Sequence, residues 1–415
     1  MPHGPDPGAV GRHAGLHCEA SPPRPMSRRP APRSRRDVLR ALGVGAAALP
    51  IAGCGLLAPA RPVDIPATVR ESPRTLPPEL RAAPPPDPVS EPVAAADSSA
   101  AEPVAAVRSL VLPRRLRPGA TVGLIAPAGV LRSADQLEAS AQAVRDLGFT
   151  PKIGRHALAR FGFLAGTDRE RAADLMTMVT DDSVDAILCV RGGWGCARIL
   201  PLLDYDAIRA NPKPIIGYSD VTALLLAIYA RAGLVTFHGP VGISTWPGTT
   251  ARAFLDVLGG GRTLSLEGET RDRRIAGETV RGGIAEGPFA GGNLSVIAAL
   301  AGTGYLPDLD GHVVFLEEVG EESYRLDRLF TQLQQAGILR NPAAVVFGQC
   351  KQCSDGGSSW TAEEVLRDHL GGYQCPAWIG APIGHVSPVY TLPIGVPVRT
   401  DADAGTLEML GPAVA

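Results

Sequence analysis

The second part of this chain alternates short apolar runs with amphipathic segments. The runs 121–127, 185–190 and 214–220 are typical of buried strands, whereas 134–147 and 196–203 have the pattern of helices. A helix-length segment between successive strands favours parallel βαβ units. We therefore expect an α/β fold whose N-terminal domain holds a parallel sheet of flavodoxin-like or Rossmann-like type.

A glycine-rich and charged stretch at 259–274 indicates a loop or linker. We accordingly place the first domain at 112–270 and a second, smaller α/β domain at 271–415. The second domain contains three further apolar runs and one helical segment, at 312–319, 343–350, 376–384 and 323–336. No internal repeat is visible in the sequence.

The first 54 residues have the features of an export leader. Arg35 and Arg36 precede a 12-residue apolar core at 41–52, which is too short to span a bilayer and is typical of a signal peptide. The arginine pair resembles a twin-arginine signal. The following residues end at Cys54 and resemble a lipobox, in which the cysteine is lipidated after cleavage. The alternative is a short buried helix beside a disordered tail.

A proline- and alanine-rich stretch at 55–111 follows the leader. It contains few large apolar residues and cannot bury a core, so we expect a disordered tether. Such a tether could reach about 160 Å as extended polyproline II. We expect a lipid-anchored protein that faces the periplasm. Gly55 follows the cysteine where an inner-membrane retention signal often has aspartate, so in a cell with two membranes we expect the outer one.

The charge balance argues against a nucleic-acid partner. The whole chain has 40 basic and 42 acidic residues. Residues 1–53 hold 8 of the basic and 3 of the acidic residues, so the remainder has 32 and 39 and a net charge of −7. Its basic clusters, at 113–117 and 271–274, are short.

A hydroxyl and a carboxylate, Ser219 and Asp220, follow an apolar run and precede a helical segment. In parallel sheets such strand ends hold ligands, and the amide of Asp220 at the helix start could stabilise an oxyanion. The usual G-x-S-x-G of a nucleophile elbow is not met, because position 221 is valine. Ser219 or Asp220 could equally be a helix cap.

Two glycines, Gly192 and Gly193, end another apolar run. They would let the backbone approach a substrate and supply a second oxyanion donor, although a tight turn is the simpler interpretation. The spacing matches neither a dinucleotide fingerprint nor a P-loop.

The run 313–319 contains two adjacent carboxylates, Glu317 and Glu318, and His385 follows a later apolar run. A half-buried carboxylate needs a partner, and the histidine could provide it. Neighbouring strand residues point to opposite faces, so only one of the two carboxylates can face His385. The chain order of Ser219, a glutamate and His385 is one that builds catalytic triads.

These residues lie in blocks that resemble the signature blocks of the LD-carboxypeptidase family. The resemblance runs from about residue 116 to the C-terminus, in matching order. The blocks are LRPGATVGLIAPAG, LAGTDRERAADL, RGGWG, IIGYSDVTALL, TFHGP, VFLEEVGEESYRLDR and IGHVSPVYTLPIGV.

The resemblance implies that Ser219 is the nucleophile, His385 the general base and Glu317, rather than Glu318, the carboxylate that orients the imidazole. The amides of Asp220 and of a glycine in the turn 191–193 would form the oxyanion hole. The active site would lie between an N-terminal domain that carries the serine and a C-terminal domain that carries the other two.

Two positions depart from the family pattern. Trp194 stands where tyrosine is commoner, and Glu318 stands where aspartate often follows the catalytic glutamate. Neither change removes a catalytic group, but Trp194 could reshape the pocket.

The resemblance also implies a substrate, the murein tetrapeptide, from which terminal D-alanine would be released without a cofactor or metal. Arg191 and Arg325 are the arginines best placed to bind a substrate carboxylate, or they form structural ion pairs. Two other functions stay open: an immunity-type amidase that cleaves peptide-nucleotide antibiotics, and a non-catalytic murein-binding lipoprotein. The partners expected are a muropeptide, a membrane through the lipid anchor, and a second copy in a homodimer.

Cys350 and Cys353 form a single C-x-x-C, and a zinc site would have to recruit Cys375 and His369. A disulfide is possible in an oxidising compartment. Because the twin-arginine route exports proteins already folded in the reducing cytosol, we expect buried free thiols instead. His238 is expected to be a core histidine with satisfied hydrogen bonds rather than a residue that faces the site.

Overall fold

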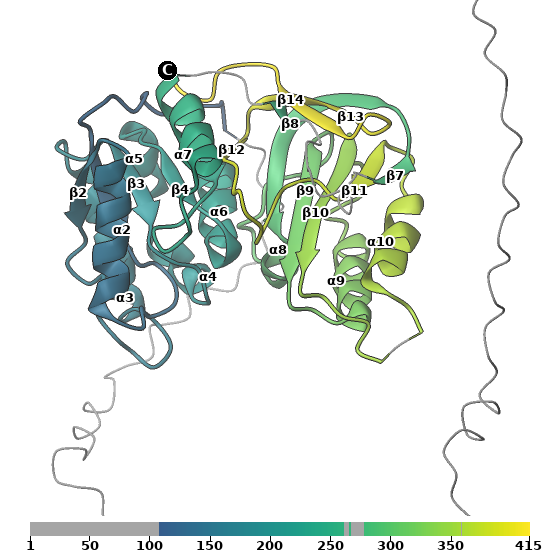
Figure 1. The fold of residues 1–415 in the computed structure, drawn as a ribbon, viewed down its shortest axis with the longest axis horizontal. Helices are drawn as coiled ribbons and strands as arrows, with labels where there is room; N and C mark the ends of the chain where they lie inside the picture. The colour runs from purple at the N-terminus through teal and green to yellow at the C-terminus, as the bar shows by residue number, and fades with distance from the viewer. Residues whose placement is uncertain (1–107, 261–264, 267–277, 358) are drawn as a thin grey trace, which may run out of the picture. The chain divides into compact units, whose positions relative to one another are not determined.

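The computed structural model describes residues 108–260, 265–266, 278–357 and 359–415 (Figure 1). The predicted leader, with Cys54, and all but the last residues of the predicted tether lie outside the described residues. Within the described ranges, no helix is long and apolar enough to cross a membrane.

The first sheet has six strands in the order β12-β5-β4-β3-β1-β2, and all but β12 are parallel (Figure 1). Its strands are β1 Thr121–Ile125, β2 Thr150–Ile153, β3 Ala186–Cys189, β4 Ile215–Gly217, β5 Thr236–His238 and β12 Leu392–Ile394. The prediction of a parallel sheet in an α/β domain is confirmed. The apolar runs of the sequence became β1, β3 and β4 because strands covered by helices on both faces are apolar throughout.

Helices connect these strands. They are α2 Ala134–Asp146, α3 Asp168–Thr180, α4 Cys196–Ile199, α5 Tyr205–Ala210, α6 Thr222–Ala232 and α7 Gly248–Leu255, with shorter turns η2 Leu200–Leu202, η3 Ser219–Val221 and η4 Asp256–Gly260. Helix α3 begins at a capping box formed by Thr167 and Glu170. Helix α6 is apolar nearly all round, and it packs against β5 of the first sheet and β8 of the second.

The second sheet has eight strands in the order β6-β14-β13-β8-β9-β10-β11-β7. Its central strands β8, β9, β10 and β11 are parallel, and the outer pairs are antiparallel. The strands are β6 Ser265–Leu266, β7 Glu278–Arg281, β8 Ile284–Asn293, β9 Val313–Val319, β10 Ala344–Lys351, β11 Ala377–Ile379, β13 Pro397–Asp401 and β14 Thr406–Met409. The helices of this part are α8 Leu294–Leu300, α9 Ser323–Gln335 and α10 Ala362–Gly371.

The two sheets are joined more closely than a linker near residue 270 suggests. Strand β12 comes from the C-terminal part of the chain but pairs with β5 in the first sheet. At the start of α6, the Thr222 hydroxyl accepts a hydrogen bond from the amide of Asn293, at the end of β8, at 3.1 Å. A β-carbon on Gly292 would lie 2.5 Å from the Thr222 side chain, so this close approach requires glycine. The carboxyl ends of β4 and β8 therefore meet.

Candidate active site

Ser219 occupies a sharp turn between β4 and α6. Its φ is 63°, and it is one of two non-glycine residues with positive φ among the described residues. A left-handed backbone at a residue with a side chain costs about 1–2 kcal/mol. A β-carbon on Gly217 would lie 2.7 Å from the Val221 side chain, so glycine is needed just before the turn. The turn has the strained geometry of a nucleophile elbow although the glycine pattern is incomplete.

The two polar residues of the turn do not cap the helix that follows them. Neither η3 nor α6 begins with a side-chain cap. The carboxylate of Asp220 instead accepts a hydrogen bond from the amide of Cys196, the first residue of α4, at 2.8 Å. Burial raises the pKa of Asp220. Its carboxylate thus ties the end of the glycine turn to the elbow.

Gly192 lies against the elbow. A β-carbon at this position would be 2.9 Å from the β-carbon of Ser219, 3.0 Å from its hydroxyl and 3.3 Å from the Asp220 amide nitrogen. The carbonyl of Gly192 accepts a hydrogen bond from the Gly129 amide at 3.1 Å, which fixes the turn on the loop after β1. The structure therefore brings the glycine turn and the serine together.

A buried arginine, Arg171, is hydrogen-bonded to the segment that follows this turn. Its guanidinium donates to the carbonyls of Gly195, at 2.8 Å, and of Pro127, and it pairs with Asp168. Arg171 was not predicted as a site residue from the sequence. The signal available was an arginine on the apolar face of the 168–180 helix, where a charged group needs buried partners.

Glu317 and His385 form a hydrogen-bonded pair. Glu317, near the end of β9, is fully buried, and its Oε2 lies 2.8 Å from Nδ1 of His385. An ionised carboxylate only accepts, so Nδ1 carries the proton and Nε2 of a neutral imidazole is left as the acceptor. A β-carbon on Gly384 would lie 2.7 Å from that same carboxylate oxygen, so glycine before the histidine allows the approach.

Glu318 faces the other way. It accepts hydrogen bonds from the Asn293 side chain at 3.0 Å and from the amides of Ser295 and Val319 at 2.9 Å each. Burial raises the pKa of Glu318, and these donors act in the opposite direction. Glu318 therefore anchors the start of α8 to β9, while Glu317 is the carboxylate that contacts His385.

Ser219 and His385 line one cavity of about 260 Å³. Its other lining residues are Arg191, Gly192, Gly193, Tyr218, Val241, Ile243 and Ser244. The His385 ring packs edge-on against Tyr218, with centroids 4.9 Å apart. Tyr218 and Ser244 were missed by the sequence analysis, although Tyr218 adjoins the serine. A nucleophile, a base and backbone amides around one small cavity can perform acyl transfer.

The two candidate arginines differ in position. Arg191 lines the cavity and donates to the Val130 carbonyl at 2.6 Å, and burial lowers its pKa, with nearby Arg132 adding to the effect. Arg325, in the first turn of α9, pairs with Glu321, which precedes that helix, and it does not line the cavity. For Arg325 the structure shows the ion pair that was its alternative interpretation.

Two expectations were wrong: the free thiols at Cys350 and Cys353, and the satisfied hydrogen bonds of His238. Cys350 and Cys353 form a disulfide rather than free thiols, because the chain turns at the end of β10 and brings their Cα atoms to 5.5 Å. His369 bonds to Asp327 at 2.7 Å. No group of three or more His, Cys, Asp or Glu in the described ranges could hold a metal ion.

His238 is buried, as expected, but neither ring nitrogen has a hydrogen-bond partner.

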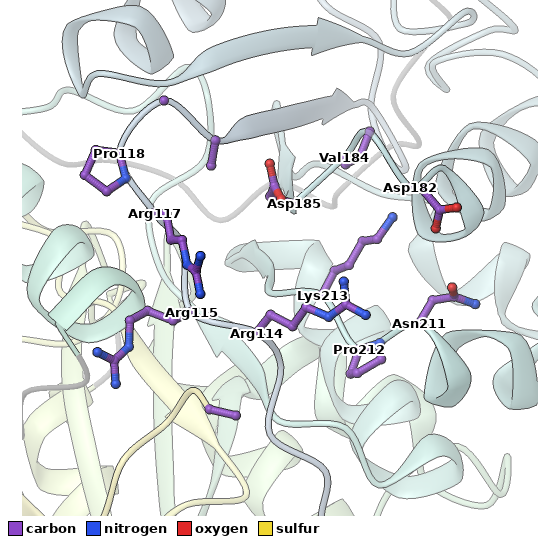
Figure 2. A pocket seen from close by; sticks show the side chains of 13 residues that line it. Arg114, Arg115, Arg117, Pro118, Asp182, Val184, Asp185, Asn211, Pro212 and Lys213 are labelled. Atoms are coloured by element: carbon purple, nitrogen blue, oxygen red, sulfur yellow. The ribbon is translucent and has the colours of Figure 1, made fainter.

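A larger cavity, of about 570 Å³, lies at the opposite edge of the first sheet, where β1, β3 and β4 begin. Figure 2 shows its charged side chains, which are Arg114, Arg115, Arg117, Lys213, Asp182 and Asp185. The Lys213 ammonium already donates to the carbonyls of Met178 and Asp181. In parallel sheets the carboxyl edge, not this amino edge, is where ligands bind, so the Ser219 cavity is the candidate site.

Comparison with known proteins agrees with this geometry. Residues 122–239 match the LD-carboxypeptidase N-terminal domain, and residues 286–400 match the LD-carboxypeptidase C-terminal domain. The chain belongs to the LD-carboxypeptidase family. It is thus a peptidase of this family, as the sequence blocks implied.

Named relatives in this family match more than half of this chain. A Streptomyces coelicolor protein assigned as a carboxypeptidase is 40% identical over 315 residues, which cover 74% of this chain and 99% of the relative. The murein tetrapeptide carboxypeptidase of Pseudomonas aeruginosa is 34% identical over 273 residues, covering 64% and 87%. The solved structure of MccF in complex with glutamyl sulfamoyl guanosine aligns with a TM-score of 0.68 at 26% identity, covering 73% of this chain and 99% of that one.

Proposed function

We propose that this protein is a serine LD-carboxypeptidase that hydrolyses the L,D-peptide bond of the murein tetrapeptide and releases D-alanine. The observation that carries the proposal is the Glu317–His385 hydrogen bond beside a cavity that also holds the strained Ser219. The similarity to the murein tetrapeptide carboxypeptidase of Pseudomonas aeruginosa supports the choice of substrate.

In the proposed reaction, Nε2 of His385 removes the hydroxyl proton of Ser219 while the oxygen attacks the scissile carbonyl. Glu317 keeps the imidazole in the required tautomer and stabilises the imidazolium that forms. The developing oxyanion is held by the Asp220 amide and an amide of the glycine turn. His385 then gives the proton to the leaving amine of D-alanine, and water hydrolyses the acyl-enzyme.

Arg191 is the group proposed to hold the terminal carboxylate of the substrate. It lines the cavity, and its guanidinium has donors beyond the one used by the Val130 carbonyl. A planar guanidinium can bind a carboxylate through two parallel hydrogen bonds, which suits an enzyme that acts only on the last residue.

The test is incubation of the purified protein with tetrapeptide muropeptides and measurement of free D-alanine. We expect release by the wild type and none by Ser219→Ala. A folded wild-type protein that releases no D-alanine from any tetrapeptide would contradict the proposal.

A second candidate is an amidase of the immunity type. The microcin C7 self-immunity protein of Escherichia coli is 33% identical over 268 residues, covering 58% of this chain and 78% of that protein. The same serine, histidine and glutamate could cleave an aminoacyl-nucleotide amide. Comparing kcat/KM for such an amide with that for a muropeptide decides between the two functions.

We also propose that the protein is exported by the twin-arginine route and anchored through a lipidated Cys54. The proposal rests on the sequence of residues 35–54, which precede the described part of the chain. A membrane-anchored enzyme on a long tether would act on stem peptides in the periplasm.

A further inference from the structure

Buried polar groups without hydrogen-bond partners lie near the Glu317–His385 pair. Both ring nitrogens of His238, Oε1 of Glu317 and the Thr391 hydroxyl have none. The His238 side chain is 1% exposed, and the other two are fully buried. Buried polar groups are nearly always hydrogen-bonded, so a cluster of them beside a catalytic pair requires an explanation.

The contacts of His238 and Glu317 place these two side chains near each other. The His238 ring lies between Tyr218 and Phe315, with centroid distances of 6.0 and 5.1 Å. Phe315 and Glu317 are two residues apart on β9 and therefore point to the same face. Strand β12 pairs with β5 so that Leu392 is opposite His238. The side chain of the neighbouring Thr391 therefore points to the other face.

Thr391 lies on the other face of β5. A β-carbon on Gly239, the residue after His238, would lie 3.2 Å from the Thr391 hydroxyl. Neighbouring strand residues point to opposite faces, so this hydroxyl is on the face away from the His238 ring. The glutamate oxygen and the imidazole that lack partners therefore lie near each other without the hydroxyl.

His238 is a neutral donor in this setting. Burial lowers the pKa of His238 to about 4, the charge of Glu317 acts in the opposite direction, and His385 lowers it further. The titratable groups that face it are Glu317 from β9, His385 from the loop after β11, and Tyr218 from the elbow. A neutral imidazole has one N–H to donate and one lone pair to accept with.

We propose that His238 is a positioning residue that donates its N–H to Oε1 of Glu317 through one buried water. The inference rests on the proposed function, in which Glu317 orients His385. Glu317 then accepts at both oxygens, from His385 at one and, through the water, from His238 at the other. Two donors fix the plane of the carboxylate, and the carboxylate fixes the plane of the catalytic imidazole.

The consequence for His385 has a definite sign. A donor on Oε1 spreads the negative charge of Glu317 and makes it a weaker partner for an imidazolium. Without that donor, the carboxylate stabilises protonated His385 more strongly, because an opposite charge favours the charged form. Removal of the His238 N–H therefore keeps His385 protonated, and inactive as a base, to a higher pH.

The test separates this role from simple packing. His238→Leu removes the donor, whereas His238→Asn and His238→Gln each retain an N–H near one of the two ring nitrogen positions. His312 provides a matched control, because it is also buried and bonds to Tyr229 at 3.0 Å. His312→Leu should lower the melting temperature without changing the chemistry at Ser219.

The first readout is the pH dependence of kcat/KM for D-alanine release. For His238→Leu we expect a loss of roughly tenfold and a shift of the acid limb to higher pH by about one pH unit, since a hydrogen bond to a charged group is worth about this much. At least one of the Asn and Gln variants should recover most of the loss. A His238→Leu profile that superimposes on wild type overturns the proposal, as does equal failure of all three variants.

The second readout does not depend on the reaction. ¹⁵N NMR of the imidazole groups follows the titration of His385 in wild type, His238→Leu and His312→Leu. We expect its midpoint to rise by about one pH unit in His238→Leu only. An unchanged midpoint overturns the role of His238 even in a protein that releases D-alanine. A raised midpoint supports it even where no D-alanine is released, an outcome that would count against the proposed function alone.

Discussion

A β-carbon on Gly192 would lie 2.9 Å from the β-carbon of Ser219, a separation that real β-carbons do not adopt. The glycine turn therefore touches the Ser219 elbow without any intervening side chain. Gly192→Ala should push the turn away from the serine and from the Asp220 amide. We expect kcat/KM to fall by roughly a hundredfold, the order of effect of losing one oxyanion donor.

Gly371 provides the control for this variant. It ends α10, and a β-carbon there would meet no atom within 4 Å. Gly371→Ala should leave kcat/KM unchanged. Equal activity of Gly192→Ala and Gly371→Ala would show that the turn takes no part in catalysis.

Replacing Ser219 should separate activity from stability. Ser219→Ala and Ser219→Gly both remove the hydroxyl, and each should lower turnover on the order of 10⁴-fold. The backbone at this position has a φ of 63°, which is strained for alanine but not for glycine. Ser219→Gly should therefore have a free energy of unfolding about 1 kcal/mol above that of Ser219→Ala. Denaturant melts of the two inactive variants measure the difference, and a more stable alanine variant would refute the strained elbow.

The two adjacent glutamates should show opposite defects. Glu317→Gln leaves His385 with a partner that cannot select its tautomer, and we expect a loss of activity on the order of 10⁴-fold with little change in stability. Glu318→Gln puts an amide group against three donors, and we expect a stability loss of about 1–3 kcal/mol with activity largely retained. Turnover and thermal melts of both variants check this. Reversal of the two phenotypes would contradict the assignment.

Burial of neutral His238 should make stability depend on pH. The folded-state pKa is about 4, against about 6.5 when unfolded, so between these values the unfolded chain binds a proton that the folded chain does not. Stability is therefore lost as the pH falls through this window. His238→Leu lacks this effect. We expect its free energy of unfolding to lie below that of wild type at pH 7, and this difference should be about 2 kcal/mol smaller at pH 4.5. Urea melts at the two pH values measure it. A deficit independent of pH would show that His238 titrates normally.

The sequence predicted those elements whose apolar runs are continuous. Strands such as β1 and β9 are buried on both faces, so their residues alone indicate strands. Strand β8 was missed because its sequence, IAEGPFAGGN, has three glycines and a proline and low strand propensity. It forms because β9 and β13 pair with it on either side, which no local pattern shows.

The candidate site was predictable in its residue types but not in its contacts. Ser219 and His385 were found because each follows an apolar run, and Glu317 because it is a carboxylate near the end of one; the family resemblance chose it over Glu318. Pairing between distant segments determines the left-handed backbone of Ser219, the hydrogen bond from the Cys196 amide to Asp220, and the lack of partners for His238. The Cys350–Cys353 disulfide was missed because its formation depends on the turn that ends β10.

The final prediction concerns where the enzyme acts. Arg35 and Arg36, a 12-residue apolar core and Cys54 precede a proline-rich stretch. A processed lipoprotein cysteine carries several acyl chains, and each buried CH₂ contributes about 0.8 kcal/mol, so anchoring should be effectively permanent.

Cells that express the full chain are separated into soluble and membrane fractions for wild type, Cys54→Ala and a matched Cys375→Ala control, whose cysteine lies within the folded part. We expect wild type and Cys375→Ala in the membrane fraction, and Cys54→Ala released from it. Labelling with radioactive palmitate should follow the same division. Wild-type protein found soluble in the cytosol, or palmitate retained by Cys54→Ala, would show that this leader does not anchor the enzyme.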